Sequence, residues 1–342
     1  MFENFWGNRP VQITLESMFQ RDRIPQTLLF AGLEGLGKAT LARRFAARIL
    51  GSPEKIERDD LNLDDNLSAI AAREKLPADK RNDDPLVFSS HPDFLTFPPE
   101  GPLRQLSIAQ MRLLKERAQY KPLHGARRVF LIDQADRANE QAANSLLKIL
   151  EEPPDHLILI MTANNVYDLL PTIRSRSIQL NFSPLSNEEM QDFARSRALP
   201  NAERRIALSG GSPGLAASLD IGLFEKRRNA MLSFLKTGAG VTPYSAWLPI
   251  SETLGRSKSE KLEIYLKLLY DLLRDLTILR ESGTAIRNAD LRNDLAALAS
   301  RVSRGWLIEA VKGVDEIAAL MRRNIQKQIA LDGLLMQMRR AS

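Results

Sequence analysis

The sequence contains no cysteine, so it has neither a disulfide framework nor a zinc site built on thiolates. That absence fits a reducing cytosol. No apolar run reaches the length of about 18 residues that a membrane-spanning helix needs. The N-terminal stretch 1–6 has no basic start and no apolar signal core. We therefore expect a soluble, cytoplasmic protein that does not enter a membrane.

The length and charge of the chain exclude fewer classes of protein. A chain of 342 residues is too long for one ordinary domain, so two or three domains are expected. The formal net charge is +6 and the isoelectric point is about 9.5, which weakly favours a polyanionic partner such as nucleic acid. The arginine doublets fall on helical patterns, however, and solvated helix faces account for most such doublets.

A glycine-rich stretch lies between an apolar run at residues 27–31 and a helical pattern at residues 41–47. In the order strand, loop, helix, glycines let backbone amides approach phosphate oxygens, and the helix directs its positive end at the same anion. A lysine then neutralises phosphate charge. The residues that match this phosphate-binding pattern are Gly32, Gly35, Gly37 and Lys38.

The loop departs from the G-x-x-x-x-G-K-[ST] pattern at its last position. Ala39 stands where a hydroxyl would hold magnesium, and Thr40 comes one residue late. One residue on a helix turns the side chain by about 100 degrees, so Thr40 is not an equivalent replacement. The pattern predicts a pocket for ATP or ADP with weakened magnesium coordination; a chance glycine-rich turn is the alternative.

Two further apolar runs end in polar residues, Asp133 and Thr162. In a parallel sheet such runs are buried on both faces, and their carboxyl ends open into the ligand crevice. We therefore expect Asp133 beside Lys38 as a magnesium carboxylate, and Thr162 near a γ-phosphate. A strand-end cap and an asparagine-rich turn are the respective alternatives. The residue that follows Asp133 is Gln134, which lacks the carboxylate of a general base.

Periodicity and composition divide the chain. Strands alternate with helices as far as residue 183, which predicts a doubly wound α/β domain over 1–183. Residues 54–84 carry ten acidic and six basic residues and are expected to form a mobile surface insertion. The remainder has helical patterns, in a small part over 184–222 and a larger domain over 223–342.

The glycine-rich loop is followed by further motifs at residues 130–133, 144–154, 172–177 and 209–214, and by a late helical segment at residues 324–332. Taken together, these motifs resemble the clamp-loader subunits of bacterial DNA polymerase III, which are P-loop proteins of the AAA+ class. The resemblance spans nearly the whole chain and implies an α/β AAA+ domain, a helical lid and an all-α collar. It also implies assembly into a hetero-pentamer with tau/gamma-type and delta-type subunits, which acts on the sliding clamp and primed DNA.

The resemblance also assigns a role to one arginine. In this family a Ser-Arg-Cys motif projects its arginine into the ATP site of the neighbouring subunit. Here the motif is Ser175-Arg176-Ser177, so Arg176 inherits the position. An arginine supplied in trans contributes about 10³ to 10⁵ in turnover because it neutralises charge that grows in the transition state. The alternative is a surface arginine bonded to its own domain.

Three positions differ from the family's motor subunits: Ala39, Gln134 and Gly214, the last standing where motors carry a sensing arginine. With Arg176 retained, they predict a stator subunit whose own ATPase activity is weak or absent. The family's four-cysteine module is missing as well, so we predict no zinc. The alternatives are a hydrolysing motor of the tau/gamma type, a related AAA+ remodelling ATPase, and a plain DNA-binding module.

Overall fold

The computed structural model describes residues 2, 4–257, 261–320 and 325–340. The chain divides into two compact units, Met1–Ala217 and Ser218–Ser342. The first unit contains the expected α/β domain and most of the expected lid, and the second contains the expected collar. The finer division of the first unit at residue 183 stays a prediction.

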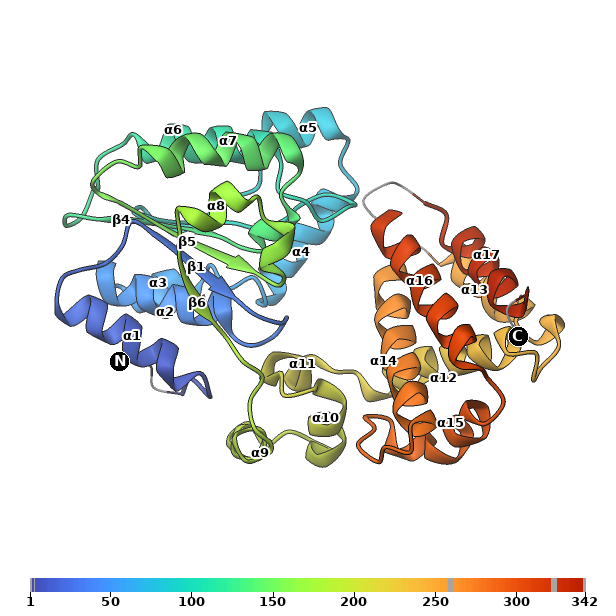
Figure 1. Ribbon diagram of the computed structural model, residues 1–342. Helices are drawn as coiled ribbons and strands as arrows, with labels where there is room; N and C mark the ends of the chain where they lie inside the picture. Colours follow the sequence, from blue (N-terminus) through green and yellow to red (C-terminus); the bar gives the residue numbers. More distant parts are fainter. Residues whose placement is uncertain (1, 3, 258–260, 321–324, 341–342) are drawn as a thin grey trace. The chain divides into compact units, whose positions relative to one another are not determined.

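The first unit is built on a six-stranded sheet with the order β2-β3-β4-β5-β1-β6 (Figure 1). All neighbouring strands are parallel except the edge pair β2 and β3. The predicted α/β fold is therefore confirmed. The strands are β1 (Thr27–Ala31), β2 (Phe88–His91), β3 (Phe94–Phe97), β4 (Arg128–Ile132), β5 (Leu157–Ala163) and β6 (Ile178–Asn181).

Helices cover both faces of this sheet (Figure 1). One core joins the sheet to α6 (Ile108–Ala118) and α7 (Glu140–Glu151), and the other joins it to α1 (Arg9–Gln20) and α2 (Lys38–Leu50). β1, β4 and β5 are buried along their whole length. A strand that is buried on both faces reads as an unbroken apolar run, which is why these three were visible in the sequence.

The rest of the first unit consists of short helices. After β4 and β5 come η1 (Ala135–Arg137), η2 (Val166–Asp168) and α8 (Pro171–Ser175). After β6 the chain continues as α9 (Asn187–Ser196), α10 (Ala202–Ser209) and α11 (Pro213–Ser218). α9 begins with a capping box between Ser186 and Glu189, which fixes the start of the expected lid.

The expectation of a mobile insertion at 54–84 is wrong. The segment forms α3 (Pro53–Glu57), α4 (Asp64–Glu74) and α5 (Ala78–Asp83), and Ile56, Asp59 and Ile70 within it are buried. Two buried arginines anchor it. Arg43 on α2 contacts Glu57 (3.3 Å) and Asp60 (2.5 Å), and Arg73 on α4 contacts Glu100 (2.9 Å) and Asp84 (3.1 Å). Ion pairs therefore hold these helices together with the burial of Ile56 and Ile70.

The described residues of the second unit form helices joined by loops and contain no strand, as predicted. Its core surrounds Trp247 and Trp306, both almost completely buried. Helical patterns were also expected at residues 258–260 and 321–324, which lie outside the described residues. The elements are α12 (Ile221–Gly238), η3 (Tyr244–Ala246), α13 (Leu248–Arg256), α14 (Leu262–Arg280), η4 (Ala289–Leu291), α15 (Arg292–Ala299), α16 (Arg304–Leu320) and α17 (Lys327–Arg340). Within the described ranges, no helix has the length and apolar character needed to cross a membrane.

Candidate functional site

The glycine-rich loop connects β1 to α2 at the carboxyl edge of the sheet. Gly35 and Gly37 have φ values of 77° and 83°, the left-handed region that glycine adopts without strain. At Gly32 a Cβ atom would lie 2.4 Å from the carbonyl oxygen of Phe182, so the backbone there leaves no room for a side chain. Each of the three positions therefore requires glycine, either for its backbone conformation or for lack of space, as in a phosphate-binding loop.

Lys38 opens α2 and turns back across the loop. Its Nζ donates to the carbonyl oxygens of Gly32 (2.6 Å) and Leu33 (2.7 Å) and to Oδ1 of Asn164 (3.0 Å). The three donors of the ammonium group are thus all engaged within the chain. Burial lowers the pKa of Lys38 to about 8, against the opposing effect of the nearby carboxylate of Asp133.

Asp133 and Thr162 meet at the ends of two adjacent strands. β4 and β5 pair in parallel, and the Thr162 hydroxyl donates to Oδ1 of Asp133 at 2.7 Å. The same hydroxyl oxygen accepts from the backbone amide of Gln134 (2.8 Å), whose φ is 51°. No direct bond joins Asp133 to Lys38. The hydroxyl of Thr162 therefore contacts the end of β4, at Asp133 and Gln134, and does not contact Lys38.

Two residues near Lys38 were not singled out from the sequence. Asn164, two residues past Thr162, supplies the side chain that contacts Lys38. Oδ2 of Asp136 accepts from the backbone amides of Asn164 (3.0 Å) and Asn165 (3.2 Å), while its Oδ1 is buried without a partner among the described residues. Burial raises the pKa of Asp136. The polar run after β5 was the signal that could have identified Asn164.

Gly214 brings the expected lid directly against the glycine-rich loop. Its amide donates to the carbonyl oxygen of Gly35 (2.9 Å), and the Ser212 hydroxyl donates to that of Glu34 (2.9 Å). A Cβ atom on Gly214 would lie 2.8 Å from the Gly35 oxygen. A longer side chain at position 214 would therefore require the two backbones to separate. On the other side of the loop, a Cβ on Gly37 would lie 2.8 Å from the Phe5 ring.

The loop retains part of what a phosphate needs. The amide nitrogens of Gly35 and Gly37 have no hydrogen-bond partner among the described residues, and both precede the N-terminus of α2 with Lys38 beside them. These groups fit a phosphate anion. They do not fit a magnesium ion held by the loop, because Ala39 has no side-chain hydroxyl and Thr40 makes no hydrogen bond to Asp133 or Lys38.

Arg176 lies at the C-terminal end of α8, away from these contacts. Its Nη1 donates to the carbonyl oxygen of Thr172 (3.2 Å), and its Nη2 contacts Oε1 of Glu151 (3.1 Å). About a third of the side chain is exposed, with a value of 36%. No hydrogen bond or ion pair connects Arg176 to the glycine-rich loop in the part of the chain that is described. Its guanidinium is thus partly exposed and bonded to α7 and α8 of its own unit, as the alternative of an arginine bonded to its own domain expects.

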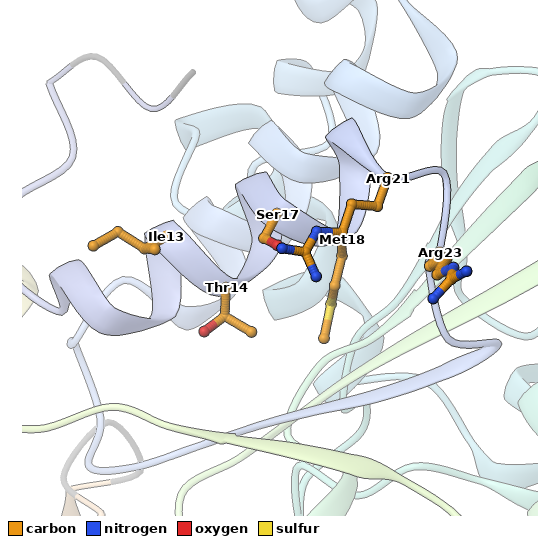
Figure 2. A pocket seen from close by; sticks show the side chains of 6 residues that line it. All are labelled: Ile13, Thr14, Ser17, Met18, Arg21 and Arg23. Atoms are coloured by element: carbon orange, nitrogen blue, oxygen red, sulfur yellow. The ribbon is translucent and has the colours of Figure 1, made fainter.

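Other features carry no sign of a ligand. A surface hollow of about 410 Å³ runs along α1, with Ile13 towards one end and Arg21 and Arg23 at the other (Figure 2). None of the predicted site residues lines it. Among the described residues, no group of three His, Asp or Glu side chains is arranged to hold a metal ion. The absence of zinc stays a prediction.

Comparisons with known proteins show what the chain is similar to. A family model described as DNA polymerase III, delta subunit, matches residues 80–186, which include Asp133 and Arg176. The delta' subunit of DNA polymerase III from Pseudomonas aeruginosa is 29% identical over 330 residues, covering 90% of each chain.

Two other similarities concern gamma-type proteins. The gamma/tau subunit of DNA polymerase III from Mycobacterium tuberculosis is 30% identical over 190 residues, covering 56% of this chain and 30% of that protein. A gamma subunit-related protein from Thermotoga maritima has 18% identity and a TM-score of 0.44, covering 96% of this chain and 99% of that one. The family model and the delta' relative show that the chain is similar to the delta-prime clamp-loader subunits of DNA polymerase III, in agreement with the resemblance found in the sequence.

Proposed function

We propose that this chain is the stator subunit of a bacterial clamp loader. In this proposal it assembles in the cytoplasm with tau/gamma-type and delta-type subunits into a hetero-pentamer, and the complex loads the sliding clamp onto primed DNA. The match to the family model and the long similarity to a delta' subunit support the assignment. The helical second unit is the part that would join the ring.

The observation that carries the proposal is the contrast between two sites on the same chain. Arg176 is a partly exposed guanidinium that is bonded to its own helix turn and to Glu151. The chain's own loop lacks a magnesium hydroxyl at Ala39 and a general base at Gln134. A subunit built this way supplies transition-state charge to a neighbour while contributing little hydrolysis itself.

Reconstitution tests this function. The chain would be mixed with the tau/gamma-type and delta-type subunits of the same organism, and clamp loading onto primed DNA would be followed by fluorescence. We expect loading to require this chain and a complex of five subunits to form. Loading that proceeds at the same rate without the chain would contradict the stator assignment.

We also propose that the chain's own loop binds the phosphates of ADP or ATP without a requirement for magnesium. Gly35, Gly37 and Lys38 would hold the anion, for the reasons of charge and geometry given above. Bound in this way, the nucleotide would be retained rather than hydrolysed, because Gln134 cannot accept a proton from water.

The pKa of Lys38 makes this binding dependent on pH. With a pKa of about 8, Lys38 is mostly charged at pH 7 and mostly neutral at pH 9. Affinity for ADP without magnesium should therefore fall by about tenfold between pH 7 and pH 9, because the neutral amine does not attract phosphate. Calorimetric titration at both pH values measures this. The Lys38→Met variant should bind weakly with no such step, and a level wild-type affinity would exclude Lys38 from phosphate binding.

A hydrolysing motor of the tau/gamma type is the second candidate. The retained Lys38 and the unpaired amides of Gly35 and Gly37 favour it. Gly214 disfavours it, because the close contact with Gly35 excludes a sensing arginine there. Single-turnover hydrolysis by the purified chain distinguishes the two candidates. Rapid hydrolysis that Lys38→Ala abolishes would support the motor.

A further inference from the structure

Arg176 is held by a second residue that the sequence did not mark, Glu151. Nη2 of Arg176 and Oε1 of Glu151 are 3.1 Å apart, and Nη1 of the same guanidinium donates to the carbonyl oxygen of Thr172. The contact joins the end of α7 to the end of α8, 25 residues apart in the sequence. It therefore sets the direction in which the guanidinium leaves the end of α8.

The stability of α7 does not explain a glutamate at this position. Glu151 is the last residue of the helix, where the unpaired carbonyl groups carry partial negative charge. A carboxylate is unfavourable at that end, and Glu152 adds a second one. Arg176 offsets the repulsion at Glu151. A residue that disfavours its own helix but contacts Arg176 is best explained by what it does to the arginine.

We infer that Glu151 is a positioning residue that holds Arg176 until the γ-phosphate of the neighbour's nucleotide replaces it. This inference rests on the proposed function of Arg176. A guanidinium pairs with planar carboxylates and with phosphates through the same two N–H groups, so the two anions compete for it. Phosphate carries the larger charge and takes the guanidinium when it is present.

The exposure of the pair makes this exchange feasible. The side chain of Glu151 is 52% exposed and that of Arg176 is 36% exposed. Exposed pairs of this kind change an equilibrium by about fivefold at most. The carboxylate can therefore set where the guanidinium rests without withholding it from a triphosphate. Because the attraction is screened by salt, its influence should be largest at low ionic strength.

The test is Glu151→Gln in the fully assembled complex. Glutamine keeps the size and one acceptor oxygen but removes the charge that competes with phosphate. We expect the apparent KM for ATP to fall about two- to fivefold at low salt, with kcat unchanged. Raising the salt concentration should shrink the difference. Glu152→Gln is the matched control, since Glu152 makes no hydrogen bond or ion pair to Arg176, and it should leave KM unchanged.

A double-mutant cycle separates this inference from the proposed function. In an Arg176→Ala background, Glu151→Gln should have no effect on KM, because the group that it holds is gone. If Arg176→Ala alone leaves hydrolysis unchanged, the proposed function fails. If Arg176→Ala lowers hydrolysis but Glu151→Gln behaves like Glu152→Gln, only the role of Glu151 fails. Circular dichroism of each variant confirms that the fold is retained.

Discussion

Replacing Arg176 by alanine should lower ATP hydrolysis at the neighbouring subunit's site by about a thousandfold or more. The guanidinium neutralises charge that develops on the transferring phosphoryl group, and alanine leaves that charge exposed in a site with little water. The measurement is single-turnover hydrolysis in a complex of this chain with a motor subunit. Nucleotide binding by that neighbour should change far less, because the contact strengthens in the transition state.

Two further variants sharpen this prediction. Arg176→Lys keeps the positive charge but loses the planar pair of donors, so it should recover only part of the lost rate. Arg195→Ala removes an exposed arginine of α9 whose ion pair is with Asp192, three residues earlier, and it should leave the rate unchanged. Equal rates for wild type and Arg176→Ala would remove the basis for a trans arginine in this chain.

Replacing Arg73 by methionine should destabilise the first unit by about 3 to 5 kcal/mol. The side chains of Arg73 and Glu100 are 10% and 2% exposed, and their ion pair is 2.9 Å long. Oε1 of Glu100 has no hydrogen-bond partner among the described residues. Removal of the guanidinium therefore leaves a buried carboxylate without its cation. Denaturant unfolding of the purified chain measures the loss.

The exposure of a neighbouring pair provides the control. Arg104 and Glu74 also form an ion pair, at 2.7 Å, but both side chains are about 30% exposed. Arg104→Met should cost at most about 1 kcal/mol because water screens that pair. The double variant Arg73→Met/Glu100→Leu should recover most of the stability, since no charge is left buried. A loss below 1 kcal/mol for Arg73→Met alone would mean that Glu100 finds another partner or becomes hydrated.

The sequence predicted the centre of the first unit well because its strands are buried on both faces. β1, β4 and β5 appear as apolar runs, and the glycine-rich loop follows directly after β1. The region 54–84 was misjudged for a physical reason. Its order depends on pairs such as Arg73 with Glu100, which are 27 residues apart, and no local pattern reports a contact of that kind.

For the candidate site, the sequence predicted which strands lie side by side but not which side chains contact each other. The ends of β4 and β5 were correctly expected at one edge of the sheet. Which polar residue after β5 faces Lys38 depends on the alternation of side chains and on the turn that follows. Thr162 bonds to Asp133, and Asn164 contacts Lys38. The predicted role of Thr162 near a γ-phosphate stays a prediction.

The close contact between the glycine-rich loop and the expected lid could not be predicted from the sequence either. Gly214 was noticed because an arginine is missing there, whereas the structure adds that its backbone contacts Gly35. That contact joins residues almost 180 positions apart. Because position 214 has no side chain, the two backbones can pack closely, and a sequence pattern does not reveal such a contact.

The central claim is that this chain supports chemistry at a neighbour's site and not at its own. It is tested most directly by comparing Lys38→Ala and Arg176→Ala in the same assembled complex, with DNA-stimulated ATP hydrolysis as the measurement. We predict that Lys38→Ala stays within about twofold of wild type while Arg176→Ala abolishes hydrolysis at the adjacent site. The opposite result, a large loss with Lys38→Ala and none with Arg176→Ala, would contradict the account.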